Sequence, residues 1–172
     1  MDNFDLNLSH RQSARLGSWD YGSNGNYFVT ICTENKVPCF VVIRDSILTS
    51  TPIGDYATKC WHSIPDHYPF VELDEFILMP DHLHGIICFA KKERSEWKQN
   101  QFGPQIQNLG AVIRGFKGAV TSFAKANNIP FQWQPRYFDR VIRNDHELNL
   151  IRDYIRDNPG QWQIRNPASN AM

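Results

Sequence analysis

Two histidines stand one residue apart in the stretch MPDHLHGII, which runs from Met79 to Ile87. On a β-strand, residues i and i+2 point to the same side, so His82 and His84 would project together while Leu83 faces the other side. Paired imidazoles on one face suit a divalent metal. Two hydrogen-bonded histidines within an ordinary sheet are the more common explanation, and this stretch alone does not decide between the two.

A second group of reactive side chains lies near the end of the chain, in the segment NDHELNLIRDYIRDNPG. Leu148, Ile151 and Ile155 have the spacing of an apolar helix stripe. At 100° per residue, Tyr154 and Asn158 lie about 40° apart on the flank of that stripe, one turn from each other. The helix alone favours a simpler explanation, in which Tyr154 is a packing residue and Asn158 caps the helix before a proline.

The elements that must position these residues follow from hydrophobic periodicity and turn residues. Thr51 is a possible helix cap and is followed by a proline at the first helical position. Only Pro80 and Asp81 separate the apolar parts of two successive strands, which suits a hairpin. The pattern predicts strands at 26–33 and 39–50, a helix from 51, strands at 71–80 and 82–90, a helix at 109–128, a strand at 136–143 and a last helix that begins at Asn144 and stops at Pro159.

Within the predicted helix 109–128, Gly115 and Gly118 each cost about 1 kcal/mol relative to alanine. That cost is acceptable where another backbone approaches closely. The order of elements contains two βαβ-like halves. It predicts an α+β protein with a ferredoxin-like antiparallel sheet and helices on one face, plus a C-terminal helix that carries the tyrosine.

The length of 172 residues suits one domain. We expect a polar N-terminal segment at 1–25, a single domain at 26–160 with a polar connector at 91–108, and a tail at 161–172. There is no signal-peptide pattern and no apolar run of membrane-spanning length, so the expected location is the cytoplasm, with no membrane partner. The four cysteines show no CxxC spacing and are expected to be reduced.

Charge is unevenly distributed, although the formal net charge is zero. Residues 1–90 carry 5 Lys and Arg against 11 Asp and Glu, whereas residues 91–172 carry 13 against 7. A net charge of zero argues against a generic basic nucleic-acid binder. The basic second half nevertheless favours a polyanionic partner on that side of the molecule.

Three motifs in this order resemble those of one family. MPDHLHGII looks like the HUH motif, two histidines around a bulky hydrophobe, of single-tyrosine transposases. WQPRYFDRVIRN followed by DYIRDNP resembles the REP-associated tyrosine transposases and their insertion-sequence relatives, and YFVTICT resembles their first strand. The resemblance extends from about Asn26 to Pro159.

The resemblance implies metal-dependent nicking and joining of single-stranded DNA at structured, hairpin or palindromic sites, through a 5′-phosphotyrosine intermediate. Carried over by position, His82 and His84 correspond to two metal ligands, Tyr154 to the nucleophile and Asn158 to the polar third ligand. The implied cofactor is Mg²⁺ or Mn²⁺, and the implied partner is single-stranded or hairpin DNA. Mobile-element relatives resemble homodimers and REP-associated relatives resemble monomers, so the resemblance leaves the oligomeric state open.

Five basic residues are candidates for contacts to the DNA backbone, of which we expect roughly two to be ordinary solvated charges. They are Arg114, Lys117, Arg136, Arg140 and Arg143. Strand alternation would place Arg136, Phe138 and Arg140 on one face.

Two aromatic residues remain ambiguous. Trp133 and Tyr137 could stack on unpaired bases or pack in the core. Tyr137 is also a rival nucleophile, although it has no ligand-type partner four residues later.

Two other classes remain open. A hairpin-binding module without cleavage activity would keep the same motifs. A metal hydrolase would need further ligands, and the other histidines show no ligand spacing; they are His10, His62, His67 and His146.

Overall fold

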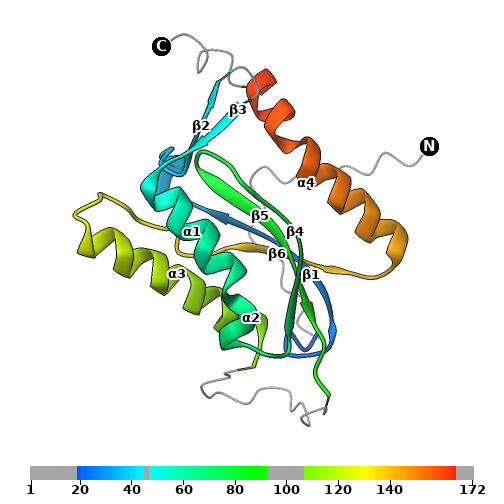
Figure 1. Ribbon diagram of the computed structural model, residues 1–172. Coiled ribbons are helices and arrows are strands. Elements are labelled where there is room, and N and C mark those ends of the chain that lie inside the picture. Colours follow the sequence, from blue (N-terminus) through cyan, green and yellow to red (C-terminus); the bar gives the residue numbers. More distant parts are fainter. Residues whose placement is uncertain (1–18, 45–46, 93–106, 166–172) are drawn as a thin grey trace.

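Four antiparallel strands form the central sheet of the computed structural model, which describes residues 19–44, 47–92 and 107–165 (Figure 1). The strands are β1 (Gly25–Cys32), β4 (Val71–Leu78), β5 (His82–Phe89) and β6 (Phe138–Ile142). Their spatial order is β4-β5-β1-β6, and every neighbouring pair is antiparallel. The predicted ferredoxin-like sheet is therefore confirmed, including the hairpin that joins β4 to β5.

Both faces of this sheet are covered, so alternate residues of each strand enter different cores. In β1, Tyr27, Val29 and Ile31 belong to the larger buried cluster, whereas Phe28 belongs to the smaller one on the other side. This explains why the central strands are apolar almost throughout rather than alternating with polar residues.

The larger cluster lies under α1 (Pro52–His62), α2 (Ile64–His67) and α3 (Leu109–Ala126). Thr51 caps α1 as predicted, because its Oγ1 accepts a hydrogen bond from the Gly54 backbone N–H at 3.1 Å. Trp61 of α1 is fully buried and packs directly on the strand at Gly85, where a Cβ atom would lie 2.2 Å from the indole. The glycine after the two histidines therefore makes room for this tryptophan.

The helix glycines of α3 have a different explanation from the one expected. A Cβ at Gly115 would lie 2.8 Å from the Tyr68 hydroxyl, so a side chain rather than a backbone approaches there. Nothing lies within 4 Å of a Cβ built at Gly118. Packing against Tyr68 therefore explains Gly115, and the structure offers no packing reason for Gly118.

The smaller cluster lies on the opposite face, under α4 (Asp145–Arg165). Its helix residues are those predicted for the stripe, and they meet Phe28, Ile86 and Ile142 of three strands. The prediction that Pro159 stops this helix was wrong, because α4 continues to Arg165. A proline inside a helix loses one backbone hydrogen bond. Here Trp162, in the turn after the proline, packs against the larger cluster and gives the extension tertiary support.

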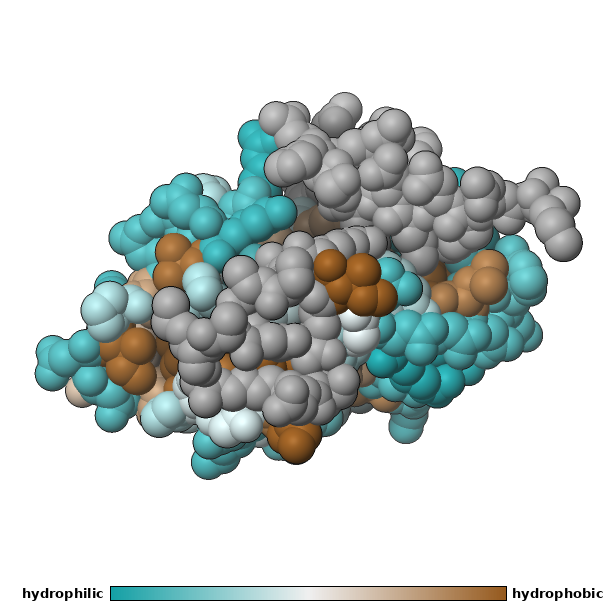
Figure 2. Space-filling model, turned by 90° about the horizontal axis from the view of Figure 1, so that it is seen from above, coloured by the Kyte–Doolittle hydropathy of each residue, from teal (hydrophilic) through white to brown (hydrophobic). Residues whose placement is uncertain are grey.

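A short hairpin of β2 (Val41–Arg44) and β3 (Ile47–Ser50) forms a separate two-stranded sheet, and the 3₁₀ turn Glu34–Lys36 precedes it. Val42, Ile47 and Leu48 of this hairpin are exposed. On the face seen from above, apolar side chains reach the surface in separate patches among hydrophilic ones (Figure 2). Among the described residues, no helix combines the length and apolar character needed to cross a membrane.

Most of the predicted terminal and connecting segments lie outside the described residues. These are 1–18 of the polar N-terminal segment, 93–106 of the connector and 166–172 of the tail. All four cysteines are free thiols, and each is partly exposed.

Candidate active site

The two histidines of β5 converge on one point above the sheet. Strand alternation sends Leu83 into the larger cluster and turns both imidazoles toward the α4 face, as predicted. Their Nε2 atoms lie 3.1 Å apart. Two nitrogen ligands at about 2.1 Å from one octahedral ion, in adjacent positions, are separated by roughly 3 Å. The spacing of the two Nε2 atoms therefore matches a shared metal.

The Nδ1 atom of each imidazole has a hydrogen-bonding partner that orients the ring. His82 Nδ1 lies 2.5 Å from Asp81 Oδ1, and His84 Nδ1 lies 2.8 Å from Thr30 Oγ1. A carboxylate accepts the Nδ1 proton of His82, which leaves a lone pair on Nε2 for a metal. Carboxylate–histidine pairs of this kind commonly fix metal ligands. Both nitrogen donors are thus oriented before any metal arrives.

Sequence reasoning missed both of these supporting residues. Asp81 directly precedes His82, and this adjacency was a usable signal. Thr30 faces His84 because β1 pairs with β5 in this register, and strand register could not be predicted from the sequence pattern.

Burial sets the protonation state of His84. The side chain is only 3% exposed, and the Phe28 ring stacks on it with a centroid distance of 5.5 Å. Burial, with a further contribution from His82, holds the pKa of the His84 imidazole well below its usual value. His84 is therefore neutral at physiological pH, which is the form that binds metal.

The tyrosine of α4 lies beside this pair. The ring centroid of Tyr154 is 5.3 Å from that of His84 and 6.1 Å from that of Phe28, and both contacts are edge-on. Asn158, one turn later on the same helix, is buried. Because α4 continues past Pro159, Asn158 is an interior helix residue and not the terminal cap of the simpler explanation.

These residues fit a divalent cation through neutral donors. Two imidazole nitrogens and the Asn158 amide oxygen carry no negative charge. Within the part of the chain that the structure describes, no group of three His, Cys, Asp or Glu side chains is placed to hold a metal. A site of the metal-hydrolase kind, with several charged ligands, is therefore absent from the described residues.

Two of the five candidate arginine and lysine residues, Arg140 and Arg143, lie near the junction of β6 and α4, and Arg136 precedes the opposite end of β6. Arg136 and Arg143 are exposed, whereas Arg140 pairs with Glu147, with Nε 2.7 Å from Oε1. The other Glu147 oxygen accepts the Arg143 backbone N–H at 2.9 Å. The Asn144 side chain caps α4, because its Oδ1 accepts a hydrogen bond from the Glu147 backbone N–H at 2.8 Å.

The remaining two candidates belong to α3, across the sheet from the histidines. Arg114 is exposed on this helix. Lys117 donates to the Gln134 carbonyl at 2.6 Å, and burial lowers its pKa. The structure therefore does not bring Arg114 and Lys117 together with the histidine pair.

The two ambiguous aromatic residues also lie on the α3 side. Trp133 packs against Phe40, Phe116 and Phe131 and donates its indole N–H to the Lys117 carbonyl. Tyr137 packs against the same larger cluster. Core packing thus accounts for both positions, and Tyr137 lies across the sheet from His82 and His84.

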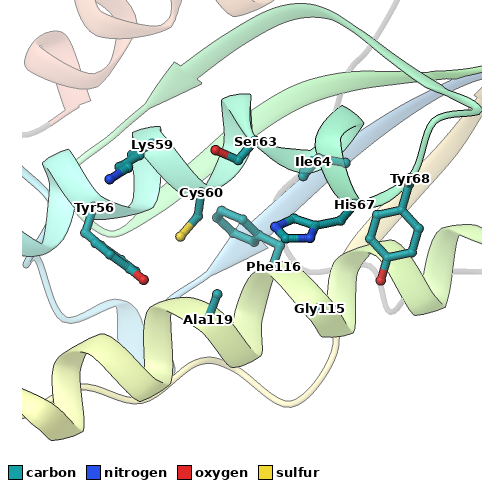
Figure 3. Close-up of a pocket in the computed structure, with 10 residues that line it drawn as sticks. All are labelled: Tyr56, Lys59, Cys60, Ser63, Ile64, His67, Tyr68, Gly115, Phe116 and Ala119. Atoms are coloured by element: carbon teal, nitrogen blue, oxygen red, sulfur yellow. The ribbon is translucent and has the colours of Figure 1, made fainter.

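A cavity of about 510 Å³ lies elsewhere, between α1–α2 and α3 (Figure 3). Its lining includes Lys59, His67 and Tyr68, and none of the predicted site residues. It opens on the α1–α3 layer and does not lead to the histidine pair. His67 is thus another histidine that stands apart from the candidate site.

Comparison with known proteins finds relatives that match most of this chain. No family model matches it. An uncharacterised protein of Haemophilus influenzae is 36% identical over 170 residues, which cover 93% of this chain and 94% of that protein. Another protein of the same organism, assigned as a REP-associated tyrosine transposase, is 26% identical over 145 residues, covering 81% and 73% of the two chains.

A solved structure supports the same grouping at the level of the fold. A REP-associated tyrosine transposase bound to a REP hairpin superposes with a TM-score of 0.60 at 19% identity, covering 83% of this chain and 71% of that one. The relatives, the fold and the three sequence motifs agree. The chain belongs to the REP-associated tyrosine transposase family.

Proposed function

We propose that this protein nicks and rejoins single-stranded DNA at hairpin or palindromic sites, through a covalent bond between Tyr154 and a 5′-phosphate. The observation that carries the proposal is the packing of the Tyr154 ring beside His84, whose Nε2 converges with that of His82. A nucleophile next to two convergent metal ligands is the arrangement that phosphoryl transfer needs. The related structure bound to a REP hairpin supports DNA of this kind as the partner.

In the proposed reaction the phenolic oxygen of Tyr154 attacks a backbone phosphorus. A tyrosine oxygen–phosphorus bond forms, the bond from phosphorus to the 3′-oxygen breaks, and the leaving oxygen takes up a proton. The phenolic proton is released. Because one phosphodiester replaces another, the bond energy is retained. A free 3′-hydroxyl can then reverse the step and join strands without ATP.

Three residues would hold the divalent cation, Mg²⁺ or Mn²⁺. They are His82, His84 and Asn158, with Asp81 and Thr30 orienting the two imidazoles. A bound cation would polarise the scissile phosphate and stabilise the charge that develops on it. Since the three protein donors are neutral, we infer that substrate phosphate and water complete the coordination. Metal affinity should therefore depend on DNA.

The junction of β6 and α4 is the proposed path for the DNA backbone. Arg140 and Arg143 lie there, and Arg136 precedes the same strand on the chain segment that leads into the helix bearing Tyr154. Arg140 is already ion-paired with Glu147, so the exposed Arg136 and Arg143 are the stronger candidates for phosphate contacts. Contacts from Arg114 and Lys117 would require the DNA to pass over the opposite face as well.

A gel assay tests this proposal. The protein is incubated with end-labelled hairpin DNA and Mg²⁺ or Mn²⁺, and the mixture is run on a denaturing gel. A covalent protein–DNA adduct that disappears with a chelator supports the proposal. A mobility shift on a native gel without any adduct would instead indicate a hairpin-binding module. If neither an adduct nor a shift forms with palindromic sequences flanking the gene, the proposed function is wrong.

A further inference from the structure

The apolar contact that holds α4 on the sheet is small. Three apolar helix residues, Leu148, Ile151 and Ile155, are buried there, and the partly buried Tyr154 packs on the same cluster. The three buried residues form one narrow stripe along two turns of the helix. Hydrophobic burial is non-directional, so directional contacts fix the rotation of a helix about its axis more sharply than an apolar stripe alone.

Charged pairs join α4 to the edge strand β4 along one flank of that stripe. The Arg152 guanidinium forms a bidentate ion pair with the Asp74 carboxylate. Its Nε donates to Oδ1 at 3.0 Å and its Nη2 to Oδ2 at 2.5 Å. One turn later, Arg156 bonds to Glu75, with Nε 2.9 Å from Oε1. A bidentate arginine–carboxylate pair fixes orientation as well as distance.

An irregularity in β4 makes this double contact possible. Consecutive residues of a regular strand point to opposite faces, so Asp74 and Glu75 could not both reach α4. The register of the β4–β5 pairing shifts between Leu73 and Phe76. Asp74 and Glu75 are the two residues within this shift. A β-bulge re-aims side chains in this way. Both carboxylates thus face the same helix.

The arginines and the tyrosine occupy opposite flanks of α4. At 100° per residue, Arg152 and Arg156 lie about 40° apart, and Tyr154 lies about 160–200° around the helix from each of them. The arginine flank reaches the edge strand, while the Tyr154 flank reaches Phe28 of β1 and His84 of β5. Rotation of the helix about its axis must therefore move both flanks together.

We infer that the ion pairs Arg152–Asp74 and Arg156–Glu75 act as a clamp that fixes the rotation of α4 and so positions Tyr154 beside the histidine pair. The four residues are positioning residues and touch neither DNA nor metal. The inference deepens the proposed function, since a positioned tyrosine matters only if Tyr154 reacts.

Small rotations are enough to matter. A turn of about 20° moves a group at the outer helix radius of about 5–6 Å by roughly 2 Å. A misplacement of about 1 Å at a reacting centre can lower a rate by roughly 100-fold. The hydrogen bond from Arg152 also lowers the pKa of Asp74, which keeps this partner charged at neutral pH.

The test measures the rate of adduct formation at saturating hairpin DNA, alongside hairpin affinity and thermal stability. Arg152→Ala and Asp74→Ala should each lower the rate about tenfold, with hairpin affinity within about twofold of wild type. The double variant should be no slower than the slower single variant, because the pair acts as one unit. Arg152→Lys, which keeps the charge but not the fork, should recover part of the loss.

Asp153→Ala is the matched control. Its carboxylate also pairs with Arg156, at 3.4 Å, but within the helix and with no contact to β4. This variant removes an acidic partner from the same turn without releasing the clamp. We expect a wild-type rate of adduct formation.

A second readout does not depend on activity. The six tyrosines are replaced by 3-fluorotyrosine, and Tyr154→Phe identifies the fluorine resonance of Tyr154. Arg152→Ala with Arg156→Ala should shift this resonance toward that of an exposed tyrosine and leave the other five in place. If the double arginine variant does not fold, the Arg156→Ala variant carries the test, because that side chain is largely exposed.

The two readouts separate the clamp from the proposed chemistry. Absence of any adduct in the wild type would contradict the proposed function, and the fluorine resonance would still test the clamp. A folded arginine variant with an unchanged Tyr154 resonance overturns the clamp. A wild-type adduct rate in that variant overturns it equally.

Discussion

The aromatic ring of Tyr154 meets the imidazole of His84 edge-on, with the ring planes inclined at 65°. One comes from the last helix and the other from a central strand, so only the folded chain brings them together. The imidazole Nε2 of His84 points at His82, and the tyrosine packs on the same face. A change that displaces either ring should therefore affect both the proposed nucleophile and the proposed metal site.

Replacing Tyr154 with phenylalanine should abolish the covalent adduct and preserve the fold, because only one hydroxyl is lost. Hairpin affinity should stay within about threefold of wild type, since the ring keeps its contacts with Phe28 and His84. Tyr137→Phe is the control and should form the adduct normally, because Tyr137 packs across the sheet. An adduct in the first variant and none in the second would reverse this assignment.

Mn²⁺ binding to the free protein should be weak and should tighten when hairpin DNA is present, because the protein supplies only neutral donors. Isothermal titration calorimetry with and without DNA measures the difference. His84→Ala should remove the DNA-dependent component. Tight zinc binding without DNA, retained after Asn158→Ala, would argue for a hydrolase and against the proposed site.

Asp81→Asn should weaken metal-dependent adduct formation by roughly tenfold or more, because the Nδ1 partner of His82 loses its charge and the ring loses its fixed orientation. The nucleophile is untouched, so added Mn²⁺ should restore part of the rate. The assay compares metal titration curves of wild type and variant at saturating DNA. Equal half-saturating metal concentrations would rule out an orienting role for Asp81.

Hairpin affinity should fall with salt, with a slope of log affinity against log salt of about −2 to −3.5 for three to five phosphate contacts. Arg136→Ala should make the slope shallower by about 0.7. Arg140→Ala should do the same, and it also leaves Glu147 without its arginine partner. Both variants should weaken cognate and scrambled hairpins about equally.

Lys125→Ala is the control for that series, since Lys125 is exposed at the end of α3 on the other face. Its slope should match the wild type. Slopes that respond to Lys125 and not to Arg136 would place the DNA on the α3 side.

Acid should remove the stabilisation that Asp74 provides. The hydrogen bond from Arg152 lowers the pKa of Asp74 below its usual value of 3.8, so the carboxylate favours the folded state at neutral pH. That contribution is present above about pH 3.8 and is lost as pH falls through the lowered pKa. Thermal unfolding should show Asp74→Asn less stable than wild type by about 1 kcal/mol at pH 7. The difference between the two proteins should shrink as the pH falls below 3.8, and a constant difference would exclude this ion pair as its source.

Much of the site could be predicted from local patterns. Strand alternation alone sends His82 and His84 to one face and Leu83 to the other. Helical spacing alone places Tyr154 and Asn158 on one flank of α4. Both are short-range consequences of backbone geometry, and the structure confirms them.

The features that could not be predicted depend on pairing between distant segments. Thr30 meets His84 through strand register, and the irregularity of β4 turns Asp74 and Glu75 to the same side. The continuation of α4 past Pro159 follows from the packing of Trp162, which outweighs a local rule about proline. Glu147 of α4 likewise accepts hydrogen bonds from the Arg140 side chain and the Arg143 backbone, which belong to the segment before the helix.

The division of the buried residues into two clusters has a consequence for motion. The sheet with α1 and α3 shares the larger cluster, whereas α4 rests mainly on the smaller one. Such a helix can detach in a local unfolding event that costs less free energy than opening the whole molecule. Amide hydrogens of α4 should then exchange with solvent faster than those of β1 and β5. In the proposed site, His82 and His84 would stay in place on β5 while Tyr154 detaches and rebinds with α4, so that the stability of this one helix would limit the proposed reaction.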